Sequence, residues 1–208
     1  MAVSRKRQSG FTLVELMVGM AISLIIMAGA VYVFTKVSEV SIQEVRAAKA
    51  SQQARDVMSF MVRDLSRAGY AGIEWQLNNP SGANSTVNIN SEKNCVTYSY
   101  NREDSVSGEV KYYGLRFDTT NKEIEVPQSN LVSADCIATS GWEGITEPSV
   151  LAVNGLVFDC SNNCDDVNKR IDITLSASGA TTSGESISIN LSETAMFMNK
   201  VSAAYASP

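Results

Sequence analysis

Nineteen consecutive residues, Leu16–Phe34, carry no charged side chain and are mostly apolar. A helix needs about 20 such residues to cross the ~30 Å hydrocarbon layer, so this run predicts a membrane-spanning helix over residues 16–35. Three basic residues precede the run, and basic residues remain on the cytoplasmic side of a membrane; they are Arg5, Lys6 and Arg7. We therefore expect a single pass that places the chain after Lys36 outside the cytoplasm.

A secretory signal peptide that is removed after export is the main alternative to a retained span. The apolar core of such a signal has about 7 to 15 residues, which is shorter than the run found here. The small residues Ala28–Ala30 resemble a signal cleavage site, but they lie inside the run rather than after it. Length and flanking residues therefore favour a retained span.

Glu15 stands immediately before the apolar run. A charged group at mid-membrane costs about 2.5 to 3.5 kcal/mol, and less near the interface, so Glu15 needs a partner. One interpretation is a capping box, because Thr12–Glu15 fits the pattern in which a hydroxyl and a carboxylate cap the first helical turn. Capping accounts for Glu15 only in part, since it leaves the glycine and the basic leader before it unexplained.

The stretch from Arg5 to Leu16, RKRQSGFTLVEL, resembles the type IV prepilin signal, which is a basic leader followed by G-F-T-L-x-E and an apolar helix. The resemblance implies that residues 1–10 are a leader, that prepilin peptidase cuts between Gly10 and Phe11, and that Phe11 becomes the N-methylated terminus. It also implies a docking role for Glu15, whose carboxylate would pair with the freed amino group of Phe11 on its own or a neighbouring subunit.

Helical spacing of apolar residues continues beyond the span, and no proline occurs before Pro80. We expect one helix over residues 11–68, a rod of roughly 85 Å at 1.5 Å per residue, with glycines 69 and 72 as its stop signal. Many major pilins have a helix-bending proline in the span, whereas this chain has Tyr32 and no proline there. Met58 and Met61 fit the core-facing side of this helix better than they fit a cofactor site.

After residue 69 the pattern changes to the alternation of β-strands. Residues 69–208 are therefore expected to form one exported, β-rich domain packed on the end of the helix, in an α+β fold. Regular alternation predicts strands at 96–100, 171–175 and 187–191; weaker candidates are 110–117, 122–126, 150–158 and 194–199, and loops are expected at 78–91 and 177–184.

The exported domain is strongly acidic. Residues 70–208 contain 8 Lys or Arg and 17 Asp or Glu, a net charge of 8 − 17 = −9. Such a domain should repel nucleic acid, so we expect no direct nucleic-acid binding from it alone.

The end of the helix, Arg63–Tyr70, reads R-D-L-S-R-A-G-Y and resembles the R-D-L-x-x-A-G-Y ending in PilW-like minor pilins. Residues 149–158, 170–177 and 185–199 are similar to the C-terminal half of that family, which it shares with J-type minor pseudopilins of type II secretion. The resemblance implies a type IV pilin fold with an antiparallel sheet and a subunit that helps initiate a type IV pilus used for twitching motility, adhesion or DNA uptake.

The four cysteines all follow the span, in an oxidising compartment where disulfides are the default. We favour a pair between Cys95 and Cys136 and a second pair between Cys160 and Cys164, although three connectivities are open. A zinc site is the rival, but the chain has no CxxC pair. Residues 159–168 are rich in Asp and Asn oxygens that calcium prefers, yet a solvated acidic turn fits their order better than a calcium loop.

No catalytic pattern was found. The chain contains no histidine, which removes the commonest general base, and it lacks the GxSxG, Walker and GxGxxG patterns. Glu123 and Glu125 lie on one face of a predicted strand, where charges at a sheet edge more often oppose aggregation than catalyse. We therefore expect neither enzymatic activity nor a cofactor or metal.

The expected partners follow from the resemblance: prepilin peptidase, other minor pilins, the major pilin and the inner-membrane assembly platform. The chain would lie in the inner membrane with its C-terminus in the periplasm, and later in the fibre at the cell surface. One alternative is a minor pseudopilin of a type II secretion system. A second is a membrane-anchored extracytoplasmic binding protein or hydrolase whose N-terminus only imitates a prepilin.

Overall fold

The computed structural model describes residues 10–70, 87–100, 112–129, 136, 141–160, 170–179 and 186–197, and the backbone of residues 203–205. The chain has two compact units, Met1–Val45 and Arg46–Pro208. The helix α1 (Leu13–Leu65) contributes to both. The predicted helix therefore exists, and it begins two residues later and ends three residues earlier than expected.

In the first unit, every described residue from Gly10 to Val37 is exposed. The apolar side chains of this segment therefore have no partner within their own unit. Burial of such side chains against lipid or another protein would be strongly favourable, at about 1.5 to 3 kcal/mol for each large one.

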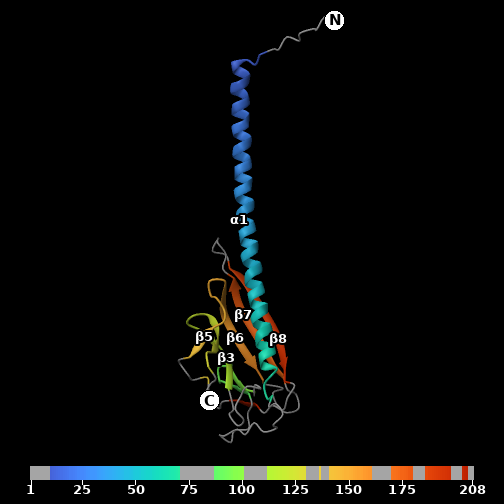
Figure 1. Ribbon diagram of the computed structural model, residues 1–208, viewed down its shortest axis with the longest axis vertical. Helices are drawn as coiled ribbons and strands as arrows, with labels where there is room; N and C mark the ends of the chain where they lie inside the picture. The colour runs from blue at the N-terminus through green and yellow to red at the C-terminus, as the bar shows by residue number, and fades with distance from the viewer. Residues whose placement is uncertain are drawn as a thin grey trace, which may run out of the picture. The chain divides into compact units, whose positions relative to one another are not determined.

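The second unit contains the end of α1 and two sheets (Figure 1). The order in the larger sheet is β5-β4-β3-β2-β1-β9, and the order in the smaller one is β6-β7-β8. All neighbouring strands are antiparallel except β1 and β9, which are parallel. The strands are β1 (Val87–Ile89), β2 (Cys95–Ser99), β3 (Tyr112–Asp118), β4 (Glu123–Pro127), β5 (Trp142–Gly144), β6 (Leu151–Asp159), β7 (Arg170–Gly179), β8 (Ile187–Met196) and β9 (Ala203–Tyr205).

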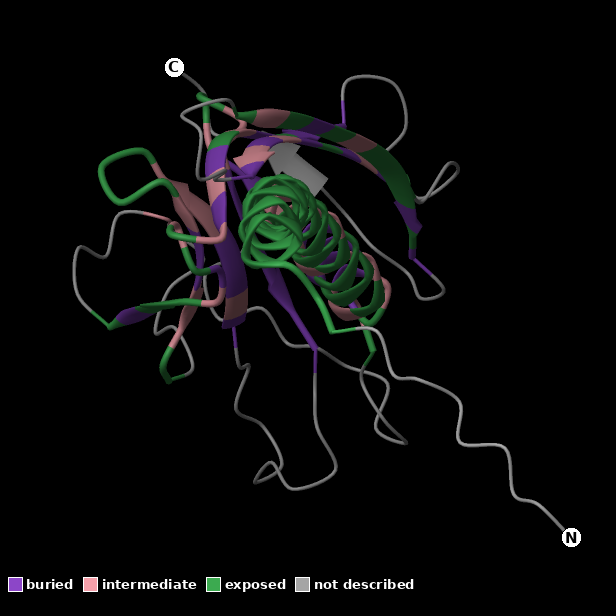
Figure 2. Ribbon diagram, turned by 90° about the horizontal axis from the view of Figure 1, so that it is seen from above, coloured by how far each residue is buried: buried purple, intermediate pink, exposed green. Residues whose placement is uncertain are grey.

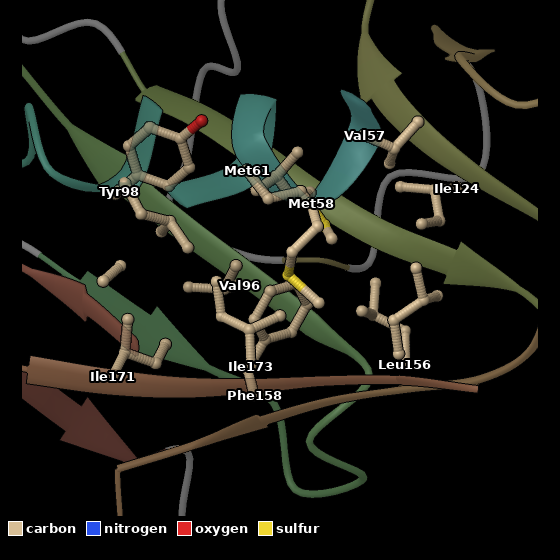
Figure 3. Packing of buried hydrophobic residues seen from close by; sticks show 14 of the residues in the cluster. Val57, Met58, Met61, Val96, Tyr98, Ile124, Leu156, Phe158, Ile171 and Ile173 are labelled. Carbon is tan, nitrogen blue, oxygen red and sulfur yellow. The ribbon is translucent and has the colours of Figure 1, made fainter. Parts of the chain in front are cut away.

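One face of α1 forms the core with both sheets. Apolar residues at helical spacing put a single stripe on the buried side of the helix: Ala50, Ala54, Val57, Met58, Met61 and Leu65. Seen along the helix, the curved strands lie around it, and many of their residues are buried (Figure 2). Figure 3 shows Met58 and Met61 among Val96, Phe158 and Ile173, which are all nearly inaccessible to solvent. The prediction that the two methionines pack in the core is confirmed.

The helix approaches β7 very closely at one point. A Cβ atom added to Gly179, the last residue of β7, would lie 2.8 Å from the Cβ of Ala50. Real Cβ atoms do not approach this closely, so two of the smallest residues set the distance between helix and sheet here.

The helix end follows the predicted stop signal. Gly69 has φ +79°, a left-handed conformation that favours glycine, and its N–H donates to the carbonyl of Ser99 at 2.9 Å. This bond joins the turn after α1 to the end of β2. Gly72, the second predicted stop residue, lies outside the described residues.

The strand predictions are confirmed in position for β2, β3, β4, β6 and β7. The two late strands expected at 187–191 and 194–199 are one continuous strand, β8, because its register with β7 runs without a break. Two loop predictions are partly wrong, since β1 lies within 78–91 and β7 continues to Gly179. The strands β5 and β9 were not predicted; at three residues each they are too short for a period to be read.

Candidate processing and docking site

The residues predicted for processing lie at the start of α1. Gly10 is exposed, and Phe11 is 86% exposed. Both precede the first helical residue, Leu13, so the predicted scissile bond is in non-helical, accessible backbone. The basic leader residues Arg5, Lys6 and Arg7 lie outside the described residues.

Thr12 and Glu15 form the predicted capping box. The backbone N–H of Thr12 donates to Glu15 Oε2 at 3.2 Å, and the N–H of Glu15 donates to Thr12 Oγ1 at 3.3 Å. The Thr12 hydroxyl also donates to Glu15 Oε2 at 3.1 Å. The carboxylate therefore stabilises the first turn, where the positive end of the helix dipole also favours it.

The capping box leaves room for a second role of Glu15. The side chains of both residues are exposed, so the carboxylate has free acceptor capacity towards other groups. Cleavage after Gly10 would create a positive amino group on the residue that directly precedes Thr12. The chemistry of this end therefore fits a charge pair between a new N-terminus and Glu15.

The apolar part of α1 meets the requirements of a membrane span. It is the one helix in the described part of the chain that is long and apolar enough to cross a membrane, with a hydropathy of 2.3 over its best window. Its serine and threonine hydroxyls donate back to the helix: Ser23 Oγ to the carbonyl of Gly19 at 2.7 Å, and Thr35 Oγ1 to that of Tyr32 at 2.8 Å. Polar groups that are satisfied within the helix lower the cost of lipid burial.

The other end of α1 is held by Asp64, which the resemblance placed in the helix-ending motif without assigning it a role. Asp64 accepts a short hydrogen bond from the hydroxyl of Tyr98 on β2 and a longer one, 3.4 Å, from Tyr100. Arg67 Nη1 lies 3.5 Å from Asp64 Oδ1, and the side chain of Asp64 is only 15% exposed. The acid of the R-D-L motif thus connects helix and sheet through charge-assisted hydrogen bonds.

Three tyrosines stack beside Asp64. The rings of Tyr100 and Tyr113 have centroids 4.1 Å apart, and Tyr98 lies 6.2 Å from each. Burial, reinforced by the negative charge of Asp64, raises the pKa of Tyr98 well above its ordinary value. Burial likewise raises the pKa of Tyr100 to about 12. Sequence analysis missed this cluster; the alternation of Tyr98 and Tyr100 with small polar residues was its only signal.

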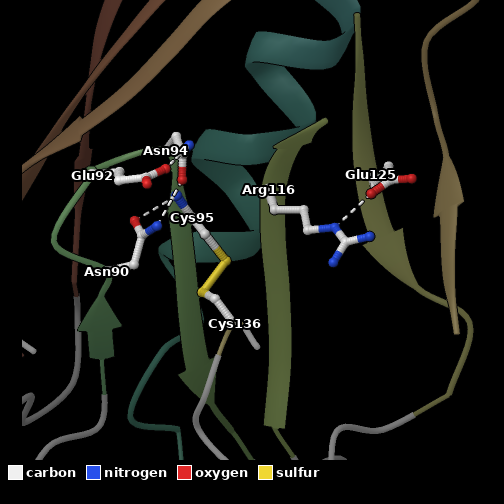
Figure 4. The surroundings of a disulfide bond; sticks show 7 residues. All are labelled: Asn90, Glu92, Asn94, Cys95, Arg116, Glu125 and Cys136. Atoms are coloured by element: carbon white, nitrogen blue, oxygen red, sulfur yellow. Dashed lines mark hydrogen bonds and ion pairs between the residues drawn. A yellow bond between two sulfur atoms is a disulfide. The ribbon is translucent and has the colours of Figure 1, made fainter. Parts of the chain in front are cut away.

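The structure contains the predicted disulfide between Cys95 and Cys136, with Cα atoms 6.2 Å apart (Figure 4). Cys95 is the first residue of β2, and its N–H donates to Asn90 Oδ1 at 3.0 Å. Cys160 is also disulfide-bonded, while its predicted partner Cys164 lies outside the described residues. This disulfide links Cys136, 41 residues further along the chain, to the start of β2.

The carboxylates of β4 do not lie on a sheet edge, so that prediction is wrong. β4 pairs with both β3 and β5. Glu125 is buried, and Arg116 Nε pairs with its Oε2 at 2.5 Å (Figure 4). The guanidinium of Arg116 also lies 4.4 Å from the ring centroid of Trp142. Arg116 thus contacts both Trp142 and Glu125, and its positive charge lowers the energetic cost of burying the Glu125 carboxylate.

Asp118 and Glu123 lie next to Glu125, and the oxygens of the three carboxylates are within 4.8 Å of one another. Partial burial and then the charges of Glu125 and Asp118 raise the pKa of Glu123. For Asp118, burial is outweighed by hydrogen bonds from Thr120 and Asn121 and by Arg116, which together lower its pKa. Within this group Arg116 pairs with Glu125 and so neutralises part of the negative charge.

The loop considered for calcium, 159–168, is described only at its start. There, Asp159 Oδ1 pairs with Lys93 Nζ at 2.9 Å, and the N–H of Phe158 donates to the carbonyl of Lys93 at 2.8 Å. These bonds connect β6 to the turn before β2. The remaining residues of the loop lie outside the described part.

A long apolar helix with a capped acidic start, packed through its second part on antiparallel sheets, defines the class of type IV pilin-like proteins. Residues 5–31 match the prokaryotic N-terminal methylation motif. Residues 43–196 match the family described as prepilin peptidase-dependent protein B, and the chain belongs to that family. No curated protein and no solved structure matched the chain.

The family match agrees with the predicted dependence on prepilin peptidase. The methylation motif, which covers most of the apolar run, agrees with the predicted membrane anchor. The family match extends from α1 to the end of β8 and therefore covers the whole interface between the helix and the sheets. The methylation motif contains Gly10, Phe11 and Glu15.

Proposed function

We propose that this chain is a PilW-like minor pilin, a structural subunit that helps initiate and assemble a type IV pilus. The observation that carries the proposal is the start of α1, where an accessible Gly10–Phe11 bond is followed by a capped Glu15 and a fully exposed apolar helix. Lipid would cover this helix before assembly, and the helices of other subunits would cover it in the fibre.

The proposal assigns a role to each residue of this end. Gly10 and Phe11 are recognised and cut by prepilin peptidase, and Phe11 is then methylated. Glu15 pairs with the terminal amino group of Phe11 on a neighbouring subunit, and this pairing sets the axial position of the incoming helix. The chain spans the inner membrane once, with its C-terminal domain in the periplasm, and acts by assembly without catalysing a reaction.

A variant of Glu15 and a variant of Thr12 together separate docking from capping. Gln at this position can still form a capping box with Thr12 but carries no charge. We therefore expect both Glu15→Gln and Glu15→Ala to be cleaved normally and to enter sheared fibres poorly. Thr12→Ala is the matched control, because it weakens the cap and keeps the carboxylate. Normal incorporation of Glu15→Gln together with poor incorporation of Thr12→Ala would show that the cap alone matters.

A minor pseudopilin of a type II secretion system is the alternative with the same anchor and processing motif. The R-D-L-S-R-A-G-Y motif at the end of the helix and the four cysteines favour the pilus. Deletion of the gene distinguishes the two roles. A pilus subunit predicts loss of twitching motility or DNA uptake with normal secretion of exoproteins; loss of exoprotein secretion alone would support the pseudopilus.

A further inference from the structure

Strand β8 forms an open edge of the smaller sheet. It pairs along all ten residues with β7, and no described strand pairs with its other side. Glu193 is its one charged residue, and it contains no proline. Edge strands are commonly protected by shortness, charge or proline, and β8 has little of this protection. Its outer backbone groups are therefore available to another strand.

Side chains of β8 and of the second part of α1 line a groove beside this edge. The two elements are labelled in Figure 1. The groove holds about 590 Å³. The buried side chain of Met58 and the half-buried Val62 and Leu191 give it an apolar floor. Arg55, Arg63 and Glu193 line it with exposed charged side chains.

The groove carries a positive charge on its helix side. Arg55 and Arg63 make no ion pair with a described residue; Arg63 Nε donates only to the carbonyl of Ser59, at 3.3 Å. Residues 46–69 contain 5 Lys or Arg and 2 Asp or Glu, a net charge of 5 − 2 = +3. Residues 70–208 have a net charge of −9. The basic side of α1 is thus a local exception in an acidic domain.

These features together select an extended, acidic peptide. Adding a strand to β8 would satisfy its outer N–H and C=O groups. Alternate side chains of an added strand point to the same face, so one set would meet the floor formed by Met58 and Leu191. Acidic side chains in that set would reach Arg55 and Arg63.

We propose that the β8 edge and its groove bind an acidic, extended segment of a neighbouring, different pilin-like subunit. This inference rests on the proposed function, which supplies such neighbours in a fibre. A second copy of this chain is a poorer occupant. Pairing β8 with β8 about a two-fold axis would bring the Arg55 and Arg63 pairs of both copies to one interface, where like charges repel.

The test is photo-cross-linking of the full chain in the bacterium. A photoreactive phenylalanine analogue is placed at Ser192, an exposed residue of β8, and in a control at Thr174, its exposed register partner on β7. Strands are about 4.8 Å apart, so the control is one strand further from the edge. We expect an adduct from Ser192 in sheared fibres and little from Thr174. Mass spectrometry should map the cross-linked peptide to an acidic segment of another chain that carries the N-terminal methylation motif.

Charge reversal tests the role of the arginines. Arg55→Glu with Arg63→Glu should lower the yield of the adduct at least about tenfold, because it replaces attraction by repulsion. Arg46→Glu with Lys49→Glu is the matched control, since both residues are exposed on α1 outside the groove. It should leave the yield nearly unchanged.

Several outcomes would overturn the inference: no adduct although the chain is present in fibres, an adduct with a second copy, an adduct with a protein that lacks the motif, or an adduct insensitive to charge reversal in the groove. Absence of the unsubstituted chain from fibres would contradict the proposed function itself, and the inference with it. The amount of chain in the sheared fraction therefore distinguishes the two failures.

Discussion

At the scale of single residues, Asp64 is the acidic side chain on which the contacts between α1 and β2 converge. It is mostly buried, and three side chains from the helix and β2 region converge on it. Hydrogen bonds to a charged group contribute about 1.5 to 3 kcal/mol each, and a donor left without its partner adds a desolvation penalty. A short acidic side chain thereby links the end of α1 to the larger sheet.

Replacing Asp64 by Asn should lower the free energy of unfolding by about 1 to 3 kcal/mol, because the donors Tyr98 and Arg67 lose a charged acceptor. Asp56→Asn is the control, since Asp56 is exposed and accepts a hydrogen bond from the likewise exposed Gln52 Nε2, at 2.8 Å on the same helix. Urea unfolding of the full chain in detergent, followed by circular dichroism, measures both. Equal effects of the two variants would contradict the role given to Asp64.

The tyrosines beside Asp64 predict a dependence of stability on alkaline pH. Their pKa values are raised in the folded chain, to about 12 for Tyr100 and well above the ordinary value for Tyr98. Tyrosine in an unfolded chain titrates near pH 10, so the unfolded chain loses protons first. The stabilisation is therefore complete below about pH 10 and is lost as the pH rises towards the folded-state values.

Tyr98→Phe should flatten this decline, because the side chain that resists ionisation most is gone. Tyr70→Phe is the control, as Tyr70 is 43% exposed. Thermal unfolding midpoints measured between about pH 9 and 12 test the difference. The same slope in the Tyr98 variant and the unsubstituted chain would contradict this account.

At the scale of elements, the regular patterns were predictable and the contacts between elements were not. The helix follows from a period of 3.6, and β2, β7 and β8 follow from a period of 2, which one segment can show by itself. The strands β3, β4 and β6 follow from weaker patterns of the same kind. The parallel pairing of β1 with β9 and the convergence of Tyr98 on Asp64 involve residues far apart in the chain. Such contacts depend on the tertiary arrangement and leave no period in the sequence.

The candidate site shows the same division. Gly10, Phe11 and Glu15 are close together in the sequence, so a local motif was sufficient to find them. The groove beside β8 combines residues near 60 with residues near 190, and no local pattern connects them. Glu125 was misread as an edge charge because strand order, which puts β4 between β3 and β5, cannot be read from alternation.

Gly179→Ala should destabilise the contact between α1 and β7. The new Cβ would lie 2.8 Å from that of Ala50, and overpacking of this kind costs about 1 to 3 kcal/mol. Gly155→Ala on β6 is the matched control, because its nearest neighbour would be Ser176 Cβ at 3.9 Å. Differential scanning calorimetry should show a lower unfolding temperature for Gly179→Ala only, and similar values for both would disprove the close approach.

The disulfide between Cys95 and Cys136 closes a segment with a sequence separation of 41 residues. Replacing both cysteines by serine should lower the free energy of unfolding by about 2 to 4 kcal/mol, chiefly through the greater freedom of the unfolded chain. Chemical unfolding of the variant and of the unsubstituted oxidised chain measures this loss. Unchanged stability would show that the bridge does not constrain the unfolded state.

At the scale of the whole molecule, the chain separates two tasks. After Glu15, the first part of α1 is uncharged up to Thr35 and exposed, and its large apolar side chains have no partner within their own unit. The second part buries one stripe against the β-sheets and leaves basic residues on the surface. A subunit that is first anchored in lipid and then transferred into a fibre needs this separation of an apolar docking end from a folded domain.

The central claim is that the chain is made as a prepilin and becomes a subunit with Phe11 at its N-terminus. Mass spectrometry of the N-terminal peptide, from chain purified out of the membrane and sheared fibres, tests it most directly. The account predicts a peptide that begins at Phe11, carries one methyl group on its amino nitrogen, and lacks residues 1–10. A mature chain that begins at Met1, or within or after the apolar run, would contradict it.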